Sequence, residues 1–126
     1  MKNVKFVDHW PLIIEDFPAA YSYEELDEHF TTIDGYLGRK EGFAIVIKLA
    51  VAKKPGPDIR RYAGEKYKAQ MEQRRRYLRA EAVVTPSKVI KGIVSAIYWY
   101  ASASHPRKVF TDFDSAVEWA RSKLDP

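Results

Sequence analysis

A basic segment holds the residues that most clearly could do chemistry in this chain of 126 residues. The stretch KYKAQMEQRRRYLR at residues 66–79 contains two lysines, four arginines and two tyrosines. Ammonium and guanidinium groups bind phosphates and carboxylates through charge-assisted hydrogen bonds. The stretch could therefore bind nucleic acid or an acidic protein, or it could be the solvated side of a helix.

The charge of the chain is concentrated in this region. The whole chain has a formal net charge of +4, from 21 Lys and Arg against 17 Asp and Glu. Residues 1–42 carry four basic and nine acidic side chains, a net of −5, whereas residues 53–79 carry ten basic and three acidic ones, a net of +7. The sequence thus contains one basic segment and is not basic throughout.

A single helix from Ile59 to about Arg79 would divide this segment into two faces. At 100° per residue, three tyrosines fall on the apolar side, where packing explains them better than base stacking does. Arg74 projects from the same side, so it would either reach solvent at the margin or meet a carboxylate. Glu72 lies at pairing distance from several cations, so the opposite side is partly neutralised. That basic side comprises Arg61, Lys68, Arg75, Arg76 and Arg79.

The best candidates for binding a partner are cations in this helix and in the loop before it. The loop VAKKPGPD at residues 51–58 contains a stiff Pro-Gly-Pro turn, and loops at the carboxyl ends of parallel strands commonly carry function. The predicted partner-binding residues are Lys53, Lys54, Arg60, Arg61, Lys68, Arg75 and Arg79.

Three kinds of partner remain open for this surface. An unidentified protein is favoured, and an acidic protein surface would suit the cations. Nucleic acid is less favoured, because no RNP signature, zinc-finger spacing or KH loop accompanies the basic segment. The acidic segment that contains Glu24, Asp27 and Glu28 could also meet the basic helix, either within one molecule or in a homodimer.

Nothing in the sequence marks a reaction class. The chain has no G-x-S-x-G elbow, P-loop, dinucleotide fingerprint or H-E-x-x-H motif, and the absence of cysteine excludes disulfides and thiolate zinc sites. Neighbouring carboxylates such as Glu15 and Asp16 stand at predicted strand ends, and other such pairs stand at helix starts. We expect His105 to be exposed in a loop and His29 to lie near the core boundary. The chain is therefore expected not to be an enzyme and to use no metal or cofactor.

The elements that position these residues alternate between strand and helix. Ser22 with Glu25 forms a capping box before the first helix, which Gly38 ends. Asp58 is expected to cap the basic helix. Thr85 is expected to cap the third helix, with Pro86 at its first position. Thr111 and Asp114 are expected to form a second capping box before the last helix. The predicted strands cover residues 10–17, 42–50, 81–86 and 108–110, with an edge strand at 4–8, and the helices cover 23–37, 59–79, 86–101 and a final segment containing Val117, Trp119 and Leu124.

This alternation predicts the α/β class, with a mostly parallel sheet of four to five strands and about four helices. A chain of this length is expected to form a single domain over residues 1–126. The longest apolar runs are too short to span a bilayer, and the opening residues lack the features of a signal peptide. We therefore expect a cytoplasmic protein with no membrane span.

The end of the chain, KVFTDFDSAVEWARSKL, resembles the closing strand and helix of the STAS superfamily. The similar positions are a phenylalanine that ends a strand, a polar cap, a small residue and a tryptophan, here Phe110, Thr111, Ala116 and Trp119. AIVIKLA is similar to the central strand of that family, and PGPDIRRYAGEKYKAQ and EAVVTPSKVIKGIVSAIYW are similar to the elements that follow it. The resemblance covers roughly residues 10–124, as a pattern rather than as identities. Within that superfamily, the chain resembles the single-domain bacterial members related to the sporulation anti-sigma-factor antagonist.

The resemblance implies a STAS-like fold and a regulatory module that binds a partner protein. In its best-known members, a serine at the start of the helix after the central strand is phosphorylated. This chain has LAVAKKPGPDIR there and no serine or threonine between Gly35 and Ala80, so the phosphorylation switch is not carried over. The fold is also similar to lipid-transfer domains, which leaves a small apolar ligand as a further alternative.

Overall fold

The computed structural model of the chain describes residues 4–19, 21–50, 56–92 and 105–124. It contains a five-stranded sheet in which the strands follow one another in chain order. The first pair is antiparallel and the other three pairs are parallel. The predicted α/β class, mostly parallel sheet and N-terminal edge strand are therefore confirmed. The strands are β1 (Lys5–His9), β2 (Leu12–Phe17), β3 (Phe43–Leu49), β4 (Leu78–Val84) and β5 (Arg107–Phe110).

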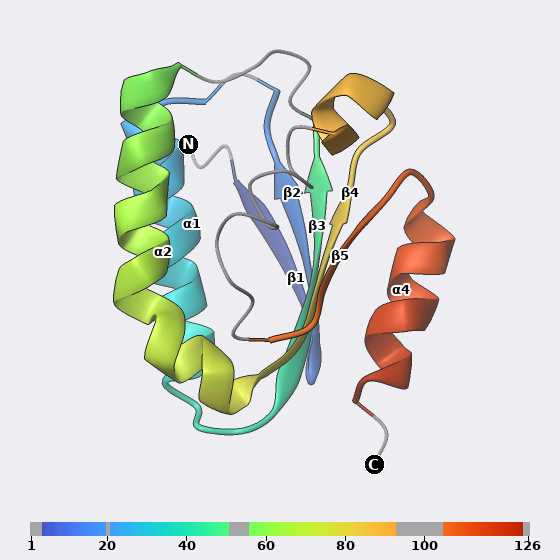
Figure 1. Ribbon diagram of the computed structural model, residues 1–126. Coiled ribbons are helices and arrows are strands. Elements are labelled where there is room, and N and C mark those ends of the chain that lie inside the picture. Colours follow the sequence, from blue (N-terminus) through green and yellow to red (C-terminus); the bar gives the residue numbers. More distant parts are fainter. Residues whose placement is uncertain (1–3, 20, 51–55, 93–104, 125–126) are drawn as a thin grey trace.

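The helices lie on both faces of this sheet (Figure 1). Helices α1 (Tyr23–Leu37) and α2 (Pro57–Tyr77) pack side by side against one face, and α4 (Phe113–Ser122) covers part of the other. Residues 88–92 are the described start of another helix. Right-handed crossovers that step along the sheet in one direction place their helices on the same face, which explains the position of α1 and α2. No helix in the described ranges is long and apolar enough to cross a membrane.

Alternation of side chains along the strands divides the apolar interior into two cores. Ile13, Ile45 and Val83 belong to the core under α1 and α2. Val46 and Ala82 belong to the core under α4, where small residues let the helix approach the sheet closely. The central strand β3 is buried over most of its length, as its nearly continuous apolar sequence predicts.

The first helix begins and ends as predicted. The backbone N–H of Ser22 donates to Glu25 Oε1 at 2.5 Å, and the Ser22 side chain accepts from the first turn of α1. Gly38 caps the other end of the helix. By contrast, α2 begins at Pro57 after Gly56, so the prediction that Asp58 caps it is wrong. Proline is well suited to the first position of a helix because no amide donor is needed there.

Two later helices begin beyond their predicted caps. Ser87 Oγ accepts from Ile90 N at 3.2 Å and the helix begins at residue 88, not at Pro86. Asp112, not the pair Thr111 and Asp114, caps α4 and accepts from Ser115 N at 2.8 Å. In each case, a second residue able to cap the helix lies one or two positions after the predicted one. The apolar spacing within residues 86–101 predicts that Val89 and Ile90 point inward, together with four positions from 93 to 98. Ile90 is buried at 3% exposure, whereas Val89 is 73% exposed, and the positions from 93 to 98 lie outside the described residues.

The junction after α2 also differs from the prediction. The helix ends at Tyr77 and β4 begins at the next residue, Leu78, without a loop between them. Leu78 is buried in the core under α1 and α2, so packing rather than a helix-breaking residue sets this boundary. As a result, Arg79 belongs to a strand and not to the basic helix.

Candidate functional site

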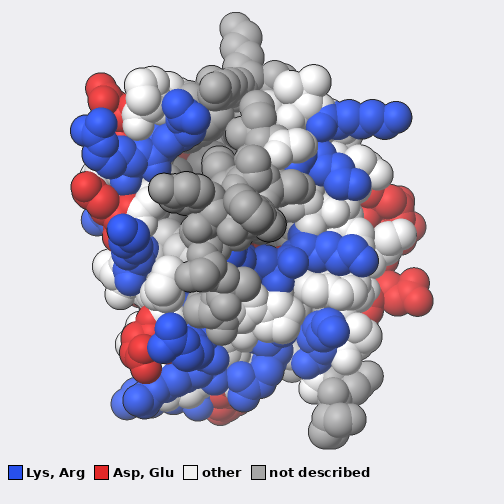
Figure 2. All heavy atoms as spheres, viewed as in Figure 1, with Lys and Arg blue, Asp and Glu red and all other residues white. Residues whose placement is uncertain are grey.

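The cations predicted to bind a partner are exposed wherever the structure describes them. Arg61, Lys68 and Arg75 follow one another at seven-residue intervals along α2, and we call them the α2 stripe. At a rise of 1.5 Å per residue, successive members lie about 10 Å apart along the helix axis. Figure 2 shows Lys and Arg along the edge of the molecule that α2 forms, with acidic side chains between some of them.

The other residues predicted to bind a partner do not all lie on this stripe. Arg60 is exposed in the first turn of α2. Arg79 is exposed on β4, and its Nη1 donates to the backbone oxygen of Arg76 at 2.8 Å. Lys53 and Lys54 lie outside the described residues, so their relation to the stripe is not established.

Carboxylates neutralise part of this surface, as the sequence predicts. Glu72 lies 3.0 Å from a nitrogen of Arg75 and 3.8 Å from one of Arg76, and both pairs are exposed. Within the described ranges, no ion pair involves Arg60, Arg61, Lys68 or Arg79. Exposed pairs contribute little binding energy, so Glu72 can release its arginines to a competing anion at small cost.

Helix α1 meets α2 within the molecule, which is one of the two arrangements considered from the sequence. The Tyr62 hydroxyl donates to Asp27, and this hydrogen bond raises the pKa of Tyr62. Lys66 Nζ lies 3.9 Å from the same carboxylate. These contacts lie on the side of α2 that faces α1, so they leave the α2 stripe accessible to solvent.

A buried polar cluster lies between α2 and the sheet. Glu81 is 3% exposed, and its Oε1 accepts from Arg74 Nη1 at 3.1 Å and lies 2.7 Å from His105 Nε2. Arg74 therefore meets a carboxylate, one of the two options that its helical position predicted. The expectation that His105 is exposed is wrong, because the residue returns to the sheet beside Glu81 and is 5% exposed.

The cluster continues toward both neighbouring helices and the edge of the sheet. Arg107 Nη1 donates to the Tyr67 hydroxyl at 3.0 Å, and the Arg74 guanidinium lies 4.4 Å from the centre of the Tyr67 ring. Burial, followed by the charge of Glu81, raises the pKa of Tyr67 to about 12. Gln70 accepts from Arg74 and donates to Asp34 on α1 at 2.7 Å. The cluster therefore ties α1, α2, β4 and β5 together.

A second buried pair lies under α1. Glu15 Oε2 lies 2.5 Å from His29 Nδ1, and Glu15 is fully buried while His29 is 9% exposed. The interpretation of Glu15 as a carboxylate at a strand end is therefore wrong. The alternation of Ile13, Glu15 and Phe17 was the available signal, because it places Glu15 on the same face of the strand as two core residues.

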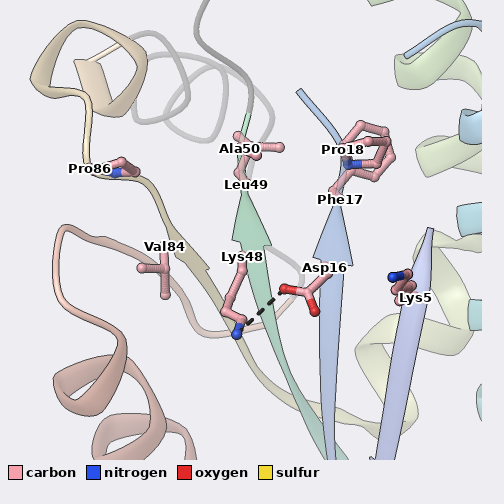
Figure 3. Close-up of a pocket in the computed structure, with 9 residues that line it drawn as sticks. All are labelled: Lys5, Asp16, Phe17, Pro18, Lys48, Leu49, Ala50, Val84 and Pro86. Atoms are coloured by element: carbon pink, nitrogen blue, oxygen red, sulfur yellow. Dashed lines mark ion pairs between the residues drawn. The ribbon is translucent and has the colours of Figure 1, made fainter. Parts of the chain in front are cut away.

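A pocket of about 540 Å³ lies over the carboxyl ends of β2, β3 and β4 (Figure 3). Its charged lining residues are Lys5, Asp16 and Lys48, and Phe17, Leu49 and Val84 are among its apolar ones. None of these three charged residues was predicted from the sequence to belong to a site. Register could have indicated them, since all three lie at one level of neighbouring strands.

Comparisons of this chain with protein-family models, with curated proteins and with solved structures find no match. Within the described parts of the chain, no group of three or more His, Asp or Glu side chains is placed to hold a metal ion. The α2 stripe and the pocket are therefore the two surfaces of the described structure that bear on function.

Proposed function

We propose that this chain is a non-enzymatic, regulatory protein-interaction module with a STAS-like fold, and that the α2 stripe binds an acidic surface of a partner protein. The observation that carries the proposal is the line of exposed cations along one face of α2, two of which have no ion pair among the described residues. The strand order and the mostly parallel sheet support the STAS-like fold. The module acts without the phosphorylatable serine found in the best-known members of that superfamily.

Two features favour an acidic protein over nucleic acid. Tyr62, Tyr67 and Tyr77 are partly buried and pack against the core, so their rings are not displayed as a platform for bases. Glu65 and Glu72 are exposed on the basic side of α2, where they would repel a continuous line of phosphates. A protein surface with separated carboxylates matches cations spaced about 10 Å apart better than a nucleic-acid backbone does.

The buried polar groups favour a binding role over catalysis. The carboxylates of Glu15 and Glu81 lie in the interior and contact histidine or arginine there, out of reach of a substrate. They link secondary-structure elements and so hold α1 and α2 against the sheet. A rigid support of this kind suits a helix that presents its outer face to a partner.

The test is the affinity of the protein for a fluorescent polyglutamate peptide and for single-stranded DNA of equal charge, measured by fluorescence anisotropy. The Arg61→Glu, Lys68→Glu variant is compared with a control, Lys88→Glu with Arg121→Glu, which makes the same charge change at exposed residues elsewhere. We expect the stripe variant to bind the peptide at least about tenfold more weakly, and the control to stay within about twofold of the wild type.

Two results would contradict the proposal. Equal losses in the stripe variant and the control would mean that total charge, not the α2 stripe, attracts the peptide. Tighter binding of DNA than of the peptide, with an affinity that falls steeply as salt increases, would instead identify a nucleic-acid module.

A further inference from the structure

Three charged side chains form a row across the pocket. Backbone register places Lys5 opposite Asp16 and Asp16 opposite Lys48, so all three lie on the α4 side of the sheet. Lys48 Nζ is 3.5 Å from Asp16 Oδ1, and Figure 3 shows these two side chains pointing toward each other. One carboxylate between two ammonium groups leaves the row with an excess of positive charge.

The position of Lys48 is unusual for a central parallel strand, where both faces are normally covered by apolar packing. Its neighbour in the register of β4 is Val84, and its ammonium lies 4.7 Å from the centre of the Phe113 ring. Helix α4 begins at Phe113, so it does not cover the carboxyl ends of β2 and β3. The Lys48 and Asp16 side chains are 43% and 51% exposed, and a ligand can therefore reach both.

We propose that this pocket binds a small carboxylate with an apolar body. The carboxylate lies on the ammonium groups of Lys48 and Lys5, and the body packs against Ala50, Val84 and Pro86. The volume of about 540 Å³ lies within the range of small-molecule sites, which combine a mostly apolar lining with a few polar groups that fix orientation. The excess positive charge selects an anion over a neutral compound of the same shape.

The site is independent of the α2 stripe, because the charged row and α2 lie on opposite faces of the sheet. A small carboxylate and a large acidic protein can thus be tested separately on the same protein. Loss of one activity leaves the other unchanged.

The first test uses octanoate as the probe, with octanamide and acetate as matched compounds that lack the charge or the apolar body. Calorimetry and methyl NMR follow the titration. We expect octanoate to bind more tightly than either compound and to shift the methyl signals of Ala50 and Val84, but not those of Val117 on α4. Equal affinity for octanamide, equal affinity for acetate, or unchanged methyl signals at Ala50 and Val84 would each overturn the proposal.

Three variants and one control make the test specific to the pocket. Lys48→Met keeps the aliphatic stem and should weaken the affinity for octanoate at least about fivefold. Lys68→Met, on the α2 stripe, should leave the affinity for octanoate unchanged. Asp16→Asn removes the competing carboxylate and should increase the affinity for octanoate severalfold. Damage to the fold would not produce such an increase. Ala50→Phe fills the end of the pocket and should abolish binding while keeping both lysines. Unchanged affinity in Lys48→Met, or weaker binding in Asp16→Asn, would overturn the proposal.

Discussion

Glu81 illustrates how a charged residue becomes part of a protein interior. Its carboxylate contacts the guanidinium of Arg74 and the imidazole of His105, and all three side chains are at most 5% exposed. Removing a charge from water costs several kcal/mol, and that cost is offset only when the partners stay in place. The stability of the cluster therefore depends on its being complete.

Replacing Arg74 with methionine would remove the guanidinium that donates to the buried Glu81 carboxylate. We expect Arg74→Met to lower the free energy of unfolding by about 3–5 kcal/mol in urea denaturation. The adjacent Arg75 is a matched control because its ion pair is exposed, so Arg75→Met should cost less than about 1 kcal/mol. Similar losses in the two variants would show that Arg74 is not an essential part of the buried cluster.

At the scale of single residues, the sequence correctly predicted which cations of α2 are exposed, but it predicted poorly which charged side chains are buried. Helical periodicity is local, so the exposed positions of Arg61, Lys68 and Arg75 follow from spacing alone. The partners of Glu81 and Glu15 are distant in the chain, since His105 is 24 residues from Glu81 and His29 is 14 residues from Glu15. Such pairs are decided by the topology that brings the elements together, and spacing within one element does not reveal them.

At the scale of elements, the existence of each described strand and helix was predictable, whereas several boundaries were not. The capping box of α1 was found because its two residues satisfy each other's backbone groups locally. The starts at Ser87 and Asp112 were missed because two neighbouring residues could each cap the helix. The end of α2 was missed because the burial of Leu78, a tertiary contact, sets it.

The capping box of α1 gives a prediction at this scale. Ser22→Ala removes the side chain that accepts from the first turn of α1, and we expect it to cost about 1 kcal/mol of stability. Ser122→Ala is the control because that hydroxyl donates to the backbone oxygen of Trp119 at an exposed helix end, so its effect should stay within about 0.5 kcal/mol. Thermal or urea unfolding of both variants decides the comparison, and equal effects would argue against the cap.

At the scale of the whole molecule, stability should be greatest in the middle of the sheet. Strands β2, β3 and β4 each have a neighbouring strand on both sides, whereas β1 and β5 lie at the edges and β1 is largely exposed. The two cores both include β3, since its side chains alternate between the faces. Strands β2 and β4 also contribute to both cores, and β3 lies between them in the middle of the sheet.

Native-state hydrogen exchange can test this distribution. We expect the amides of β3 to exchange most slowly, those of β2 and β4 next, and those of β1 and β5 fastest among the strands, because edge strands open without global unfolding. Exchange is read residue by residue by NMR. Protection of β1 equal to that of β3 would show that the sheet opens as a single unit.

The chain-order arrangement of the sheet has a consequence for synthesis on the ribosome. Each strand pairs with the strand made just before it, so the sheet can grow as the chain emerges, without waiting for a distant segment. After β3 has emerged, however, its second edge stays unpaired until α2 and β4 have followed, an interval of about thirty residues in an apolar strand. This interval is when the nascent protein is most exposed to aggregation, and a pause in translation there would be more harmful than one after β4.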